Sequence, residues 1–141
     1  MAKKLKFEFD VLIFGISYKF LPPDYIVKVE NHETKICIFP DFYKKHKLEF
    51  CSRFSEFILL RIGDLIREHA TSVYAHTCKI NNLKISQEEY VKMLTPRIIE
   101  LNEDEDNKAF ATILIYNNET ASDGFENIYI GRDMNIVKWT S

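Results

Sequence analysis

The sequence predicts an α+β fold in which a mainly antiparallel sheet packs against two helices. Short runs of alternating or β-branched residues occur near both ends of the chain, and such runs are typical of antiparallel meanders. Residues 54–70 carry apolar side chains at helical spacing, and a helix-capping pattern begins at Ser86. Strands that are grouped and helices that are separated favour α+β layers over alternating βαβ units.

The bulk composition is that of one water-soluble domain. The chain has 141 residues, 46% hydrophobic and 28% charged, so residues 1–141 are expected to form a single domain. A net charge of −2 argues against a globally basic nucleic-acid binder. No run approaches the roughly 18 apolar residues that a membrane helix needs. The odd set of three cysteines indicates free thiols in a reducing compartment, so we expect a cytoplasmic protein that does not bind membranes.

Residues 4–20 change the parity of their apolar positions at Gly15. Apolar residues occupy odd positions before this glycine and even positions after it. One long strand bent at a β-bulge explains the change, because an extra residue moves the buried set to the other parity. Two short strands that meet at a tight turn explain it as well. We favour the bent strand and keep the two short strands as the alternative.

The next strands are expected between residues 25 and 39. Residues 21–24 predict a turn, because their two prolines cannot donate to a sheet. Residues 25–29 and 35–39 are rich in β-formers and are separated by a short polar segment, which predicts a hairpin that ends at Pro40. The first part of the chain is therefore expected to be a three-stranded antiparallel meander.

The clearest helical pattern covers residues 54–70, with Ser52 placed to cap it. Gly63 costs this helix about 1 kcal/mol relative to alanine, a cost that is tolerated where another element packs close. His69 falls on the polar edge of the helix and is interpreted as a surface residue. Residues 73–80 are rich in β-branched and aromatic side chains and predict a strand.

A second helix begins at Ser86, where residues 86–89 match a capping box. Residues 95–96, Thr-Pro, should end or kink this helix, or restart it with Pro96 at the first helical position. Residues 102–107 are expected to form an acidic loop.

The C-terminal part of the chain predicts a second meander. Residues 109–116 are apolar at nearly every position, which indicates a central strand covered on both faces. Residues 125–130 and 136–139 supply two more strands, with a turn between them at 131–133. The expected order is βββ-α-β-α-βββ, with about six to seven strands in the two meanders.

Two charged segments supply the candidate binding residues. Segment 42–53 contains the densest positive run, flanked by aromatic residues, and residues 103–106 are all carboxylates. Interfaces favour aromatic anchors with a polar rim, and acidic residues raise the association rate with a basic partner. The candidate partner-binding residues are Phe42, Tyr43, Lys44, Lys45, Lys47, Glu103, Asp104, Glu105 and Asp106.

No local pattern identifies a catalytic residue, a metal ligand or a cofactor. His76 and Cys78 would share one face of the predicted strand 73–80, where an imidazole and a thiol can assist a nucleophile or bind a metal. Two residues on one strand face lie roughly 7 Å apart, however, too far for direct contact. Serine-hydrolase, zinc-protease, Walker and dinucleotide-binding motifs do not occur. Whether His76 and Cys78 form a site stays open.

The expected function is a small intracellular protein–protein binding module, such as an inhibitor or an immunity-type protein. This expectation follows mainly from the lack of a catalytic pattern in a well-ordered domain. One alternative is a small enzyme that uses a Cys/His site. Another is oligonucleotide binding through segment 42–53, where cations neutralise phosphate and aromatic rings stack on bases. A homodimer through exposed terminal strands also stays open. The Lys-, Ile-, Asn- and Phe-rich composition is compatible with a bacterial or phage origin.

Overall fold

The computed structural model describes residues 9–20, 26–28, 34–80, 82–106, 108–117 and 125–140. Along the chain the elements are β1 (Phe9–Ile13), β2 (Ile16–Phe20), β3 (Ile26–Lys28), β4 (Lys35–Ile38), α1 (Pro40–Lys45), α2 (Leu48–Ile80), α3 (Gln87–Met93), β5 (Leu94–Asp104), β6 (Ala109–Asn117), β7 (Phe125–Ile130) and β8 (Ile136–Thr140). The predicted α+β class is confirmed. The predicted element order is wrong, because all three helices fall between β4 and β5.

The main sheet has six strands in the order β3-β4-β5-β6-β7-β8, and β1 and β2 form a separate two-stranded sheet. Every neighbouring pair is antiparallel except β4 and β5, which are parallel. Parallel neighbours need a long crossover connection, and α1, α2 and α3 provide it. The sheet is therefore mixed, not purely antiparallel.

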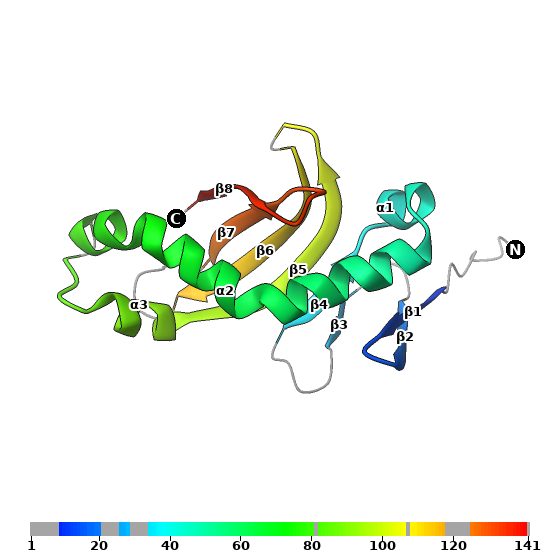
Figure 1. The fold of residues 1–141 in the computed structure, drawn as a ribbon, viewed down its shortest axis with the longest axis horizontal. Helices are drawn as coiled ribbons and strands as arrows, with labels where there is room; N and C mark the ends of the chain where they lie inside the picture. The colour runs from blue at the N-terminus through cyan, green and yellow to red at the C-terminus, as the bar shows by residue number, and fades with distance from the viewer. Residues whose placement is uncertain are drawn as a thin grey trace, which may run out of the picture.

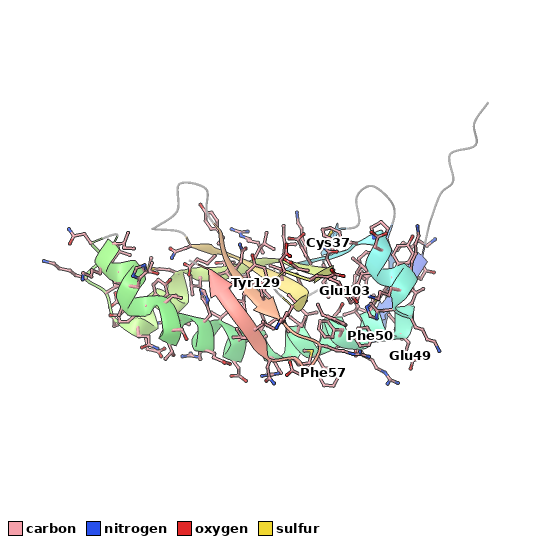
Figure 2. All side chains as sticks on the ribbon, turned by 90° about the horizontal axis from the view of Figure 1, so that it is seen from above. Cys37, Glu49, Phe50, Phe57, Glu103 and Tyr129 are labelled. Carbon is pink, nitrogen blue, oxygen red and sulfur yellow. The ribbon has the colours of Figure 1, made fainter. Side chains whose placement is uncertain are left out.

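Helices α2 and α3 lie on one side of the main sheet, α2 runs across it, and α1 lies beyond one end of it (Figure 1; Figure 2). Helix α2 has 33 residues, which corresponds to a length of about 50 Å. In β6 every second residue is buried and the residues between them are half-buried. The strand is central, as predicted, but the prediction that both faces are covered is wrong, because α2 and α3 cover only one of them.

A tight hairpin explains the change of parity at Gly15. Strands β1 and β2 pair antiparallel, with Ile13 opposite Ile16 and Val11 opposite Tyr18. Phe14 and Gly15 form the turn, with φ angles of 49° and 79°, as a two-residue type I′ hairpin turn requires. Paired residues share one face, so odd positions before the turn lie beside even positions after it. The favoured single bent strand is wrong, and the alternative of two short strands is confirmed.

Helix α2 extends without a break through residues 73–80, so the strand predicted there is wrong. Val73, Thr77 and Cys78 are buried at helical spacing after Ala70 and continue the apolar stripe of the helix. Burial of this stripe beside α3, where the Tyr74 ring contacts that of Tyr90, outweighs the β-propensity of the segment, since that propensity depends strongly on context. The predicted cap at Ser52 is also wrong, because the helix begins at Leu48.

Several shorter predictions are decided by the observed strand pairing and helix ends. The hairpin of residues 25–39 is confirmed as β3–β4, although β1 and β2 do not join it in one meander, and the turn predicted at 21–24 lies outside the described residues. The capping box at 86–89 is confirmed, and so is the meander β6–β7–β8. The acidic loop at 102–107 is wrong in part, because β5 extends to Asp104.

Candidate interaction surface

Helix α1 forms directly after β4 because its sequence has the features of a helix start and end. Pro40 occupies the first turn, where its missing N–H costs nothing. Asp41 lies in the first turn, and Lys44 and Lys45 lie in the last, so each charge opposes the partial charge of the helix end. Phe42 is buried and fixes this short helix on the core.

Glu103 of β5 connects the basic segment to the acidic segment. The Lys45 Nζ lies 2.7 Å from one Glu103 carboxylate oxygen, and the His46 Nε2 lies 2.6 Å from the other. Hydrogen bonds from Lys45 and then His46 lower the Glu103 pKa, and the same carboxylate raises the pKa of Lys45. Two segments that the sequence could only name separately therefore form one continuous surface.

We call this region the α1–β5 surface and define it by its exposed and half-buried residues. Its members come from the end of α1, the α1–α2 connection, the end of β5 and the turn that follows. They are Tyr43, Lys44, Lys45, Lys47, Glu103, Asp104, Glu105 and Asp106. Phe50 and Glu103 are labelled near this end of the molecule in Figure 2.

Phe42 differs from the other candidate residues, because only 1% of it is exposed. Its ring belongs to a cluster beneath the surface, in which neighbouring ring centroids lie 4.5 to 6.4 Å apart. The other members are His46, Phe50, Phe54 and Phe110. The interpretation of Phe42 as an exposed aromatic is wrong. The ring supports the surface from below and does not reach a partner.

Two adjoining hollows lie beside Glu103 and across the sheet. One, of about 310 Å³, is lined by Asp41, Phe42, Lys45, Asn102, Glu103 and Glu105. The other, of about 260 Å³, is lined by Glu100, Asn102, Asp104, Thr112, Leu114, Asn127 and Tyr129. Asn102 lines both, so the hollows are neighbours.

Sequence reasoning missed a buried polar network centred on Glu126. This carboxylate of β7 accepts hydrogen bonds from Tyr90 of α3 at 2.9 and 3.0 Å and from the Asn117 amide of β6 at 2.8 Å. The His69 Nε2 of α2 lies 2.7 Å from it. Burial acts to raise the Glu126 pKa, but the hydrogen bonds from His69 and Asn117 outweigh it, so the pKa is lowered.

The assignment of His69 to the surface is wrong, since its exposure is 0%. The signal that would have found it is its position, four residues after Leu65 and four before Val73, on the buried stripe that includes Ala70. Neither hollow described above is lined by the network. With Glu126 only 4% exposed, the arrangement can hold a charge inside the core but offers no described route to a substrate.

Burial disfavours the thiolate form of all three cysteines. Burial raises the pKa of Cys37 to about 11, with a further contribution from Glu100, and raises that of Cys51 to about 12. Burial also raises the pKa of Cys78. His76 is exposed while Cys78 is buried, because two residues apart on a helix means nearly opposite faces. Among the described residues, no group of three or more His, Cys, Asp or Glu side chains is arranged to hold a metal ion.

Helices in the described ranges include no stretch that is both long and apolar enough to cross a bilayer. No family model, no curated protein and no solved structure matches this chain.

Proposed function

We propose that this protein is a protein–protein binding module, of the kind that serves as an inhibitor or an immunity protein, and that the α1–β5 surface contacts the partner. The observation that carries the proposal is the bridge from Lys45 and His46 to Glu103. It joins the two charged segments into one surface with both signs of charge. Such a surface favours one partner orientation, because like charges brought together are repelled.

The aromatic cluster beneath the α1–β5 surface favours the same function. Phe42, Phe50 and Phe110 pack edge-on or tilted under α1 and the start of α2. A surface that is already ordered loses less conformational entropy when a partner binds. The α1–β5 surface therefore has the rigidity that tight recognition needs.

The two other function classes receive less support from the same region. Oligonucleotide binding needs aromatic faces open to bases, but Phe42 is buried and the Phe50 ring packs within the aromatic cluster. The carboxylates of residues 103–106 would also repel phosphate. A Cys/His enzyme needs a thiolate, and burial raises the pKa of all three thiols.

The test is a pull-down with three immobilised forms of the chain from a lysate of the source cell at moderate salt. The first is the wild type, and the second is Lys44→Glu/Lys47→Glu on the α1–β5 surface. The matched control is Lys79→Glu/Lys84→Glu, which reverses two exposed lysines at the other end of α2. We expect the wild type and the control to retain one stoichiometric protein that the second form loses.

Thermal unfolding of all three forms checks that each is folded. Equal retention of the same protein by all three forms would remove the α1–β5 surface as the binding site. Recovery of nucleic acid, with an affinity that falls steeply as salt rises, would replace the proposal with the oligonucleotide alternative.

A further inference from the structure

One face of the six-stranded sheet is left uncovered by the described helices. Helices α2 and α3 lie on the opposite side, and α1 lies beyond one end of the sheet (Figure 1; Figure 2). Strand register places Cys37, Glu100, Thr112 and Tyr129 in one row across β4, β5, β6 and β7. Since directly paired residues share a face, this row crosses the uncovered side of the sheet.

The hollow over β5, β6 and β7 lies on this face and is acidic. The residues that line it include the carboxylates Glu100 and Asp104 and no lysine or arginine. The adjoining hollow adds Asp41, Glu103 and Glu105, with Lys45 as the one cation in its lining. That lysine is already paired with Glu103, and carboxylates outnumber cations in the lining of both hollows.

Glu100 is the central carboxylate of the uncovered face. It is half-buried, and burial raises its pKa. No hydrogen bond or ion pair to another described residue stabilises its charge. A partly desolvated carboxylate gains more from a cation than an exposed one does, because less of its charge is already screened by water.

We propose that this face docks a basic segment of the partner protein, with an arginine side chain seated against Glu100 and beside Tyr129. The inference rests on the proposed function and specifies the chemistry of the partner. A guanidinium binds a carboxylate through two parallel hydrogen bonds and stacks on aromatic rings, which an ammonium does less well. Asn102, Thr112 and Asn127 line the same hollow and offer oxygen acceptors for its remaining N–H groups.

The other occupants of such a face fit less well. Nucleic acid would bring phosphates against the carboxylates of both hollows. A second copy of this chain would bring the same Glu100 and Asp104 lining against the hollow over β5, β6 and β7. The acidic lining of this hollow, rather than the charge of the whole face, favours a basic protein segment.

The direct test measures binding of a fluorescein-labelled hexa-arginine peptide by fluorescence anisotropy at low salt. Glu100→Gln keeps the shape of the side chain and removes its charge, and Glu68→Gln makes the same change on the exposed surface of α2. We expect Glu100→Gln to weaken binding about tenfold, the effect of losing one charged hydrogen-bonded pair. Glu68→Gln should leave the affinity unchanged. Thermal unfolding confirms that both variants are folded.

The location is tested by following amide NMR signals during the titration. Shifts confined to β5, β6 and β7 support the proposal. Equal loss of affinity in the two variants would mean attraction by net charge alone and would overturn it, as would shifts that map to α2. Binding of a hexa-glutamate peptide or of an oligonucleotide at this face would overturn it too.

The pull-down separates this inference from the proposed function. A partner lost by Lys44→Glu/Lys47→Glu but retained fully by Glu100→Gln leaves the α1–β5 surface in place and overturns the basic-segment site. A partner retained by Lys44→Glu/Lys47→Glu but lost by Glu100→Gln overturns the α1–β5 surface as the binding site and supports the basic-segment site.

Discussion

Glu126 connects the helical layer to the sheet through buried polar contacts. Its carboxylate is bound by side chains from α2, α3 and β6. Buried polar networks of this kind are stable only when their members are satisfied, and then they specify one packing arrangement. The His69 Nδ1 has no hydrogen-bond partner among the described residues, so the network depends strongly on the contacts of Glu126.

We expect Glu126→Gln to lower the free energy of unfolding by about 2 to 3 kcal/mol, because hydrogen bonds to a buried charged acceptor are worth about 1.5 to 3 kcal/mol. The substitution keeps the shape but removes the charge that His69, Tyr90 and Asn117 face. Urea unfolding measures the change. Glu68→Gln, an exposed position on α2, should change the value by less than about 0.5 kcal/mol. Similar values for the two variants would contradict a stabilising role of the network.

The lowered pKa of Glu126 also predicts how stability depends on pH. A carboxylate whose folded-state pKa lies below its unfolded value, about 4.3, contributes stability that is fully present above the unfolded pKa. This contribution is lost as the pH falls through the folded pKa. The difference in unfolding free energy between the wild type and Glu126→Gln should therefore shrink as the pH is lowered below 4. A difference that stays constant from pH 7 to pH 3 would show that the charge of Glu126 does not stabilise the fold.

At the scale of elements, α2 is a long helix whose two halves have different sequence characters. Its first half shows a clear amphipathic pattern, whereas residues 73–80 are rich in β-formers. Gly63, near the middle of α2, is exposed, and a Cβ added there would meet nothing within 4 Å. The expectation that another element packs close to this glycine is therefore wrong.

Because the space at Gly63 is open, Gly63→Ala should stabilise the protein. Alanine is favoured over glycine in a helix interior by about 1 kcal/mol. Chemical denaturation should show an increase of this size in the free energy of unfolding, without a change in the denaturant slope. A decrease would mean that the backbone at this position is approached closely by another group.

At the scale of the whole molecule, two sheets share one long helix. The six-stranded sheet packs on α2, and the β1–β2 hairpin attaches near the start of the same helix. There the Phe14 N–H donates to the Glu56 carboxylate at 3.0 Å, and the Ser52 hydroxyl donates to the Leu12 carbonyl. A two-stranded hairpin is marginally stable by itself, so its stability depends on this attachment.

We therefore expect amide hydrogen exchange to divide the molecule into two levels of protection. The amides of β6, paired on both sides within the main sheet, should exchange only through global unfolding. The amides of β1 and β2 should exchange faster, through local opening of the hairpin. Native-state exchange measured by NMR at increasing denaturant distinguishes the two levels. Equal protection of β1 and β6 would mean that hairpin and sheet unfold as one unit.

The amino-acid sequence by itself determined those features whose signals lie within a few residues. These are the α+β class, the β3–β4 hairpin, the capping box at Ser86 and the β6–β7–β8 meander. Alternation along a strand and a serine three residues before a glutamate act locally, so they are readable without the rest of the chain. The sequence also identified both charged segments of the α1–β5 surface.

Only the tertiary structure decided the features that depend on distant partners. Residues 73–80 are helical because the segment buries side chains beside α3, and the helix cost of β-branched residues is smaller than the gain from burial. The burial of Phe42 and His69 depends on Phe110 and Glu126, residues far away in the sequence. The parallel pairing of β4 with β5, which brings α1 beside Glu103, depends on the path of three helices. Such contacts join residues far apart in the sequence, and a local sequence pattern does not show which helix or strand faces will pack together.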